Sequence, residues 1–167
     1  MTGYAGGSYA NHKGRAVNTL CLPRHPIYNK TQPGVQGGVG RGYVYGVEYE
    51  FDSSNSIDAK YTELKNQEMS CAVCRAPRST VLMVPGRNIC YDGWTQEYRG
   101  YLIAGDYDFN AATKYECMDE NPETVSDQVT GSNNGAWFFF VESRCTGSLP
   151  CPPYVDGNEL TCAVCTL

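Results

Sequence analysis

Nine cysteines in a chain of 167 residues are the feature that most constrains its fold. Such a density is typical of proteins that mature in an oxidising compartment, where cysteines pair as disulfides. We therefore expect a secreted, extracellular protein. The first residues, "MTGYAGG", have neither a charged n-region nor an apolar h-region, so we expect no signal peptide within this numbering.

Four of the cysteines lie in two copies of the sequence "CAVC", at Cys71 to Cys74 and at Cys162 to Cys165. Ala-Val favours an extended chain, and residues three apart in a strand point to opposite faces. We therefore expect each cysteine of a copy to bond to a separate, distant partner. A zinc ribbon needs its two pairs about 15 to 20 residues apart, and a redox motif needs a helix N-terminus. Because neither pattern is present, structural disulfides are the favoured interpretation.

The segment "CTGSLPC", from Cys145 to Cys151, is different. It contains Gly and Pro and is short enough to curl back on itself. We expect these two cysteines to close a small loop.

Composition predicts an all-β fold. The chain contains 18 Gly, 9 Pro and 13 Tyr, and only 19% of its residues are charged. These residues favour turns and strands over helices. The length suits one domain or two small, closely packed halves.

An internal repeat divides the chain into two units. Matching segments occur in the same order in both halves, at offsets that fall from 97 residues (100 − 3) to 91 residues (162 − 71). This pattern predicts a tandem duplication, with the first unit over residues 1–80 and the second over residues 81–167. The matches are "GYAGGSY" with "GYLIAGDY", Cys21 with Cys117, Val47-Glu48 with Val141-Glu142, and the two "CAVC" segments.

The repeat leaves one cysteine without a counterpart. Cys90 in the second unit corresponds to position −7 (90 − 97), so its first-unit equivalent would precede Met1. A complete pair of units would therefore carry ten cysteines, and one partner is missing.

Charge and hydropathy disfavour two classes of partner. The net charge is −5 and Lys and Arg do not cluster, which disfavours nucleic acid and a polybasic membrane contact. No apolar run approaches the roughly 18 residues of a membrane helix. We expect no nucleic-acid partner and no membrane span.

Catalytic patterns are weak, and we predict that the chain is not an enzyme. His12 and His25 lie in Gly/Pro-rich segments and are expected on surface loops. Glu48 and Glu50 share one face of a predicted strand, and a glycosidase needs two carboxylates roughly 5 to 10 Å apart. Because Glu48 is matched by Glu142 in the repeat, a structural role is favoured.

Binding patterns are also open to two interpretations. The aromatic residues Tyr43, Tyr45 and Trp137 to Phe140 are expected in the core or between subunits, while "GSNNGAW" (131–137) fits a sugar-binding loop or an ordinary Asn-Gly turn. The acidic run from Met118 to Asp127 lacks the spacing of a calcium loop. We expect no metal and no cofactor. Asn29 begins an Asn-x-Thr glycosylation sequon in a predicted surface loop.

Several of these segments resemble one known family. "GYAGGSY", "LCLPRHP", "PGRNICYDGWTQEYRGYLI" and "LPCPPYVDGNELTCAVC" are similar to the C-terminal noncollagenous domain of the short-chain (spongin-type) collagens of sponges and other invertebrates, which is related to that of type IV collagen. The resemblance covers essentially the whole chain. It implies two homologous all-β subdomains and an extracellular matrix role in assembly, with a homo-oligomer, most plausibly a trimer.

The resemblance also implies a disulfide pattern, and it leaves Cys74 for an absent cysteine or for another chain. The short-loop pair rests on spacing alone, because in type IV collagen the comparable loop precedes the aromatic strand. No Gly-X-Y repeat is present, so any collagenous stretch lies outside this sequence. The alternative function is a lectin-like carbohydrate-binding module. The implied pairs are Cys21 with Cys71, Cys90 with Cys165, Cys117 with Cys162, and Cys145 with Cys151.

Overall fold

The computed structural model of the protein describes residues 1–14, 16–35, 37, 40–125 and 135–167. It confirms the all-β prediction, since nine strands join in one sheet and the only helix assigned in these residues is a single turn, α1 (Ala59–Thr62). The strands are β1 (Thr2–Gly7), β2 (Leu20–Pro23), β3 (Tyr45–Tyr49), β4 (Ser70–Ala72), β5 (Val81–Pro85), β6 (Thr95–Ala104), β7 (Glu116–Asp119), β8 (Ala136–Phe140) and β9 (Thr161–Thr166).

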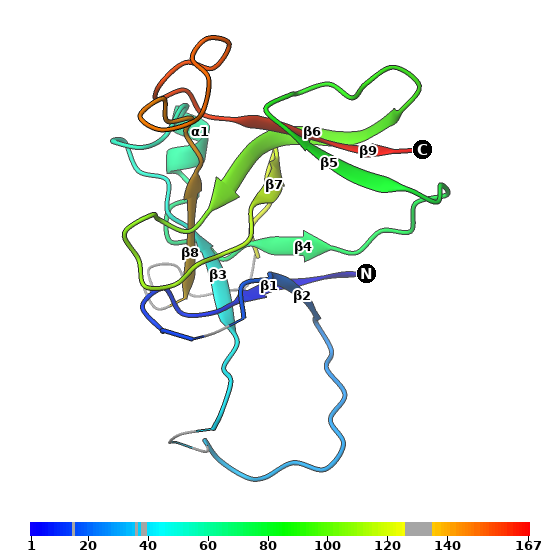
Figure 1. The fold of residues 1–167 in the computed structure, drawn as a ribbon. Coiled ribbons are helices and arrows are strands. Elements are labelled where there is room, and N and C mark those ends of the chain that lie inside the picture. Colours follow the sequence, from blue (N-terminus) through cyan, green and yellow to red (C-terminus); the bar gives the residue numbers. More distant parts are fainter. Residues whose placement is uncertain (15, 36, 38–39, 126–134) are drawn as a thin grey trace.

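The sheet curls through the order β2-β1-β3-β8-β6-β9-β5, with β4 paired to β1 and β7 paired to β6 (Figure 1). Its centre is the pairing of β3 with β8, in which Glu48 lies opposite Trp137. This pairing is parallel, whereas all the other strand pairings are antiparallel. The two halves of the chain therefore meet along β3 and β8.

Each half contains the same arrangement of strands around this centre. In the first half β1 lies between β2 and β4, and Gly3 faces Cys71. In the second half β6 lies between β7 and β9, and Gly100 faces Cys162. Gly100 and Cys162 are the repeat counterparts of Gly3 and Cys71, so equivalent residues form the equivalent pair in each half.

The two equivalent glycines, Gly3 and Gly100, sit where strands approach closely. A Cβ atom on Gly3 would overlap the carbonyl oxygen of Leu22, and one on Gly100 would overlap that of Met118. Glycine is needed at both positions because only a residue without a side chain leaves room for the neighbouring backbone.

The core lies between the halves and is built from aromatic rings. Phe51 stacks on Phe140 with ring centroids 4.1 Å apart, and Tyr61 packs edge-on against Phe140 at 5.4 Å. The hydroxyl of Tyr61 donates a hydrogen bond to the carbonyl oxygen of Glu120 at 2.9 Å, which satisfies its polar end. The core thus joins a helical turn of the first half to strands of the second.

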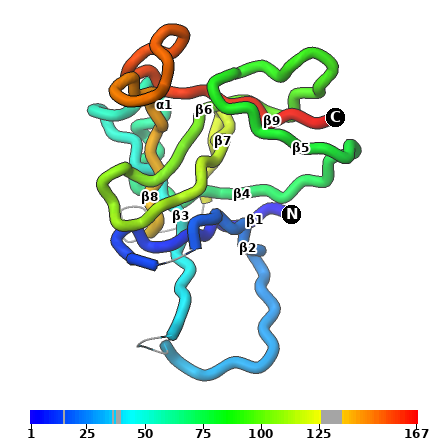
Figure 2. Tube along the Cα trace, viewed as in Figure 1, coloured from blue at the N-terminus to red at the C-terminus, as the bar shows by residue number. Residues whose placement is uncertain are grey.

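Residues 24–35, 37 and 40–44, which we call the arm, leave this body between β2 and β3. Figure 2 shows the arm extending away from the sheet. Ile27 is 98% exposed and Val35 is 90% exposed, and Tyr28 is exposed as well. The arm thus presents apolar side chains to solvent.

Candidate functional site

The protein contains four disulfides, and Cys74 is left as an exposed free thiol. The bonded pairs are the four that the family resemblance implies. Because Cys71, Cys162 and Cys165 bond to three different distant partners, they are not thiolate ligands of zinc. The disulfides are Cys21–Cys71, Cys90–Cys165, Cys117–Cys162 and Cys145–Cys151.

The two "CAVC" segments are both extended, as predicted, but they lie in different surroundings. The second forms part of β9, which is paired with β6 on one edge and β5 on the other. The first contributes to β4, which is paired with β1. In the part of the chain that the structure describes, no strand pairs with the opposite edge of β4.

Backbone hydrogen bonds define which groups face the open edge of β4. The N-terminal ammonium of Met1 donates to the carbonyl oxygen of Val73 at 2.8 Å, and the N–H of Val73 donates to the carbonyl oxygen of Met1 at 2.7 Å. In an antiparallel ladder, neighbouring residues direct their N–H and C=O groups to opposite edges. The N–H and C=O groups of Ala72 and Cys74 therefore point away from β1, toward the open edge.

The same alternation in β9 shows how such an edge is filled. Leu167 and Thr80 exchange two backbone bonds of 3.1 Å, and Cys165 and Ala163 lie opposite Leu82 and Val84 in the next positions of the ladder. Ala163 and Cys165 are both 0% exposed. Their equivalents in the first half, Ala72 and Cys74, are exposed.

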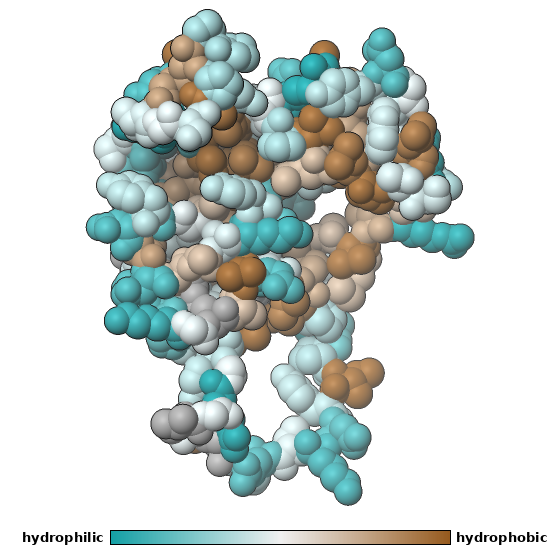
Figure 3. Space-filling model, in the orientation of Figure 1, coloured by the Kyte–Doolittle hydropathy of each residue, from teal (hydrophilic) through white to brown (hydrophobic). Residues whose placement is uncertain are grey.

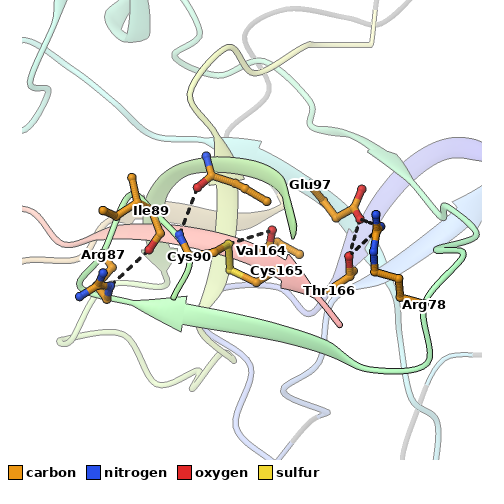
Figure 4. The surroundings of a disulfide bond; sticks show 9 residues. Arg78, Arg87, Ile89, Cys90, Glu97, Val164, Cys165 and Thr166 are labelled. Atoms are coloured by element: carbon orange, nitrogen blue, oxygen red, sulfur yellow. Dashed lines mark hydrogen bonds and ion pairs between the residues drawn. A yellow bond between two sulfur atoms is a disulfide. The ribbon is translucent and has the colours of Figure 1, made fainter. Parts of the chain in front are cut away.

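The cover over β9 consists of β5 and the loop that follows it. Cys90 in this loop bonds to Cys165 (Figure 4). Trp94 packs against a small cluster that includes Val84 and Ala163. The N–H of Cys90 donates to the side-chain oxygen of Gln96 at 3.2 Å. One disulfide and one apolar cluster therefore fasten β5 in place.

A polar contact closes the far end of β9. The hydroxyl of Thr166 donates to Glu97 at 2.6 Å, and Arg78 forms an ion pair with the same carboxylate at 3.1 Å (Figure 4). Thr166 is almost fully buried, whereas Arg75, at the equivalent position beside β4, is exposed.

An open cleft of about 740 Å³ lies beside β4. Its walls include Ala72 and Cys74 from the first half and Tyr98 and Glu116 from the second. Figure 3 shows a hollow in the surface between the regions that carry β4 and β5 in Figure 1. The open edge of β4 thus borders free space that docked side chains can enter.

Burial shapes the electrostatics of this cleft. It raises the pKa of the Tyr98 hydroxyl, which donates a hydrogen bond to the carbonyl oxygen of Cys117 at 3.0 Å. Burial also raises the pKa of Glu116, although Lys114 opposes the shift. Burial therefore disfavours the charged form of both groups on the second-half wall.

A second notable surface is a group of rings that we call the aromatic cluster: Tyr9, His12, Tyr43, Tyr45 and Trp137. Tyr9 lies between the others, with its ring centroid 5.0 Å from His12 and 6.2 Å from Trp137. The indole N–H of Trp137 donates to the buried carboxylate of Glu48 at 3.2 Å. The sequence indicated Tyr43, Tyr45 and Trp137 as core or intersubunit residues, but it gave no sign of Tyr9 and His12, because only the pairing of β1 with β3 brings these two near.

The other predicted residues take varied positions. His12 and His25 are exposed, as predicted, and Asn29 is exposed on the arm. Glu48 is buried against Trp137, which gives it a structural contact. Glu50 is half-buried, and one of its carboxylate oxygens has no hydrogen-bond partner among the residues that the structure describes. Residues 131–134 of the predicted Asn-Gly turn and residues 126–127 of the acidic run lie outside the described residues.

Comparisons with family models, curated proteins and solved structures found no match to this chain. Within the described ranges, no three His, Cys, Asp or Glu side chains are grouped so as to hold a metal ion. The helical residues in those ranges are too few and too polar to cross a bilayer.

Proposed function

We propose that this chain is an extracellular assembly domain of a short-chain-collagen-like matrix protein, and that it acts by forming a homo-oligomer of three copies. The main support for this proposal is the exposure of apolar side chains on the arm. The arm projects from the body (Figures 1 and 2). Ile27 and Val35 are almost fully exposed, and Tyr28 is exposed as well. Apolar side chains held away from their own core are typical of surfaces that another subunit covers.

The sequence of the arm suits exchange between subunits. Its Gly and Pro residues favour a loop that does not collapse into regular structure. Seated on a neighbour, the arm would bury its apolar side chains, each worth roughly 1.5 to 3 kcal/mol when fully covered. Three copies exchanging three arms would close a ring by one repeated contact.

The four disulfides support an extracellular location, since such bonds persist in oxidising compartments. The resemblance to noncollagenous domains of invertebrate collagens supports a matrix role. The matching strand arrangement of the two halves supports a tandem duplication of one unit.

Size-exclusion chromatography with light scattering tests the assembly proposal. We expect a trimer for the natural sequence and a monomer for the triple variant Ile27→Ser, Tyr28→Ser, Val35→Ser. A control changes two exposed apolar residues of the body, Tyr107→Ser and Val155→Ser, and should remain a trimer. A strictly monomeric natural sequence would contradict the proposal.

The aromatic cluster favours a second candidate function, the binding of carbohydrate. Exposed rings such as Tyr43, grouped with His12 and Trp137, can stack on the apolar faces of sugars. A glycan array should then report one sugar class, and Tyr43→Ala should weaken that binding at least 10-fold. Tyr107→Ala, at an exposed ring outside the cluster, is the control.

A further inference from the structure

The loop between β6 and β7 (Figure 1) carries Tyr107, a tyrosine that lies almost entirely in solvent. Its side chain is 99% exposed, although tyrosine rings in folded proteins are usually packed at least in part against other residues. The residues on either side of it are Asp106 and Asp108. A phenol hydroxyl is therefore presented to solvent between two aspartates.

The turn that holds Tyr107 is fixed at its base. The N–H of Phe109 donates to the carbonyl oxygen of Asp106 at 3.3 Å, and the N–H of Asp108 donates to the Asp106 carboxylate at 2.8 Å. The ring of Phe109 packs against that of Trp137, with the two centroids 5.3 Å apart. The turn is therefore attached to the body through Phe109, while the ring of Tyr107 is left in solvent.

The sequence repeat allows a comparison, because Tyr9 is the counterpart of Tyr107 in the first half. Tyr9 is flanked by Ser8 and Ala10 instead of two aspartates. It is half-buried, and its ring packs against other rings of the aromatic cluster. Acidic neighbours and full exposure therefore occur at this position in the second half alone, so the fold of the unit requires neither of them.

Two other tyrosines each share one of these features. Tyr49 also lies between two acidic residues, but it is 3% exposed, and its hydroxyl donates to the carbonyl oxygen of Glu123 at 3.1 Å. Tyr28 is 75% exposed, but both of its neighbours are uncharged. Of the 13 tyrosines in the chain, Tyr107 is therefore the one that combines an exposed hydroxyl with an acidic residue on each side.

Acidic residues beside a phenol suit an enzyme that transfers an anionic group. Such an enzyme binds a negatively charged donor, so its active site is rich in Lys and Arg. The sequence from Gly100 to Thr113 contains neither Lys nor Arg that would repel such a site. Acidic flanks and an exposed phenol therefore favour modification of Tyr107 by an enzyme of this kind.

The disulfides decide between the two common anionic groups of modified tyrosine, sulfonate and phosphoryl. Four disulfides indicate that the chain passes through an oxidising secretory compartment. Tyrosine phosphorylation takes place mostly in the reducing cytosol, whereas tyrosine sulfation takes place on secreted proteins. Sulfonate is therefore the favoured group.

We propose that Tyr107 is a site of O-sulfation by a tyrosine sulfotransferase of the secretory route. The phenol oxygen attacks the sulfur of a donor in which sulfate is joined to a nucleotide phosphate. An O–S bond forms at Tyr107, the S–O bond to the phosphate breaks with its electron pair leaving on the nucleotide, and the phenol proton passes to a base of the enzyme. The product has a permanent negative charge between two carboxylates, which suits contact with a basic surface. This inference rests on the extracellular location in the proposed function and not on the homo-oligomer.

Labelling with radioactive sulfate tests the proposal. The chain is secreted from animal cells behind a cleavable secretion signal, and the labelled tyrosine is located by mass spectrometry of its peptides. We expect label at Tyr107 and none at Tyr28 or Tyr49, and Tyr107→Phe should abolish it. The double variant Asp106→Asn, Asp108→Asn should lower the label at least about 10-fold, because it removes both charges that attract the enzyme. An asparagine oxygen at position 106 can still accept the turn's hydrogen bond, so the turn is kept.

A second measurement separates the effect of exposure from that of sequence. Two synthetic peptides, residues 104–112 ("AGDYDFNAA") and 46–54 ("GVEYEFDSS"), are incubated with a purified tyrosine sulfotransferase and its donor. We expect both peptides to be labelled, because both tyrosines lie between acidic residues. When the folded protein is given to the same enzyme, Tyr107 should be labelled and Tyr49 should not, because Tyr49 is buried.

Three results would overturn the sulfation proposal: no sulfate at Tyr107 in the secreted protein, phosphate there in place of sulfate, or undiminished labelling after both aspartates are changed. Light scattering of the same secreted samples keeps this proposal apart from self-assembly. A trimer without sulfate at Tyr107 would remove the sulfation alone. A sulfated monomer would remove the proposed self-assembly alone.

Discussion

The sequence "CAVC" lies within β9, and its other copy begins in β4 and ends just beyond it at Cys74, yet the copy at β4 is mostly exposed and the copy in β9 is mostly buried. Each is paired with the equivalent strand, β1 or β6, and each is tied by an equivalent disulfide, Cys21–Cys71 or Cys117–Cys162. The difference lies in β5, which covers β9 and has no counterpart on β4 among the described residues. Whether the residues of a "CAVC" segment are buried therefore depends on the presence of a covering strand, not on the segment itself.

The largest expected effect comes from unfastening the cover of β9. The double variant Cys90→Ser, Cys165→Ser removes a bridge between residues 75 apart, which should lower the free energy of unfolding by about 4 kcal/mol. Denaturation in urea measures this loss. Cys74→Ser, at the equivalent of Cys165 in the first half, should change stability by less than about 0.5 kcal/mol because its side chain is exposed. Equal losses from both variants would break the comparison.

The glycines test whether the two halves obey the same packing constraint. Gly100→Ala and Gly3→Ala each place a Cβ against a backbone carbonyl, and each should cost about 2 to 3 kcal/mol. Gly46→Ala on β3 is the matched control, since its Cβ would meet no atom within 4 Å. A large cost at Gly100 with none at Gly3 would show that the halves are not equivalent. Thermal unfolding followed by circular dichroism measures all three.

A smaller effect is expected at the polar end of β9. Thr166→Val removes the hydroxyl that donates to Glu97 and accepts from Arg78, and it should cost about 1 kcal/mol. Arg75→Ala, at the equivalent position beside β4, should cost less than about 0.5 kcal/mol because that side chain is exposed. Urea titration of both variants checks this difference. A loss at Arg75 that matches the loss at Thr166 would contradict it.

The smallest effect depends on pH. It is expected at Glu116 on β7, whose equivalent on β2, Leu20, has no ionisable side chain. Burial raises the pKa of Glu116, so its charged form destabilises the fold above that raised pKa, and its protonated form does not. Glu116→Gln should therefore increase the melting temperature slightly at pH 7. The gain should shrink as pH falls through the raised pKa and vanish below the ordinary value of 4.5. A gain that is independent of pH would exclude the charge as its cause.

Much of the fold could be predicted from the sequence because it repeats local patterns. The "CAVC" segments are extended as Ala-Val predicts, and the paired residues Gly3–Cys71 and Gly100–Cys162 follow the repeat offsets. The repeat also indicated that Cys90 has no equivalent in the first unit. A repeat describes one unit twice, however, and it carries no information on how two units join. The parallel pairing of β3 with β8 was therefore not predicted.

Features that depend on long-range geometry could not be predicted from the sequence. The aromatic cluster needs Tyr9 to reach Tyr45 across the pairing of β1 with β3. The arm was predicted as a surface loop around Asn29, but its projection from the body depends on where β2 and β3 end. Whether the edge of β4 is open depends on whether another strand lies beside it. Residues 70–74 alone do not determine this.

Hydrogen exchange of single backbone amides, measured by NMR on the protein alone, tests the difference between the two strands most directly. We predict that the amides of Ala163 and Cys165, which face β5, exchange at least 1000-fold more slowly than those of Ala72 and Cys74, as about 4 kcal/mol of added protection requires. Equal and slow exchange at all four amides would show that the edge of β4 is already covered, and would contradict the account.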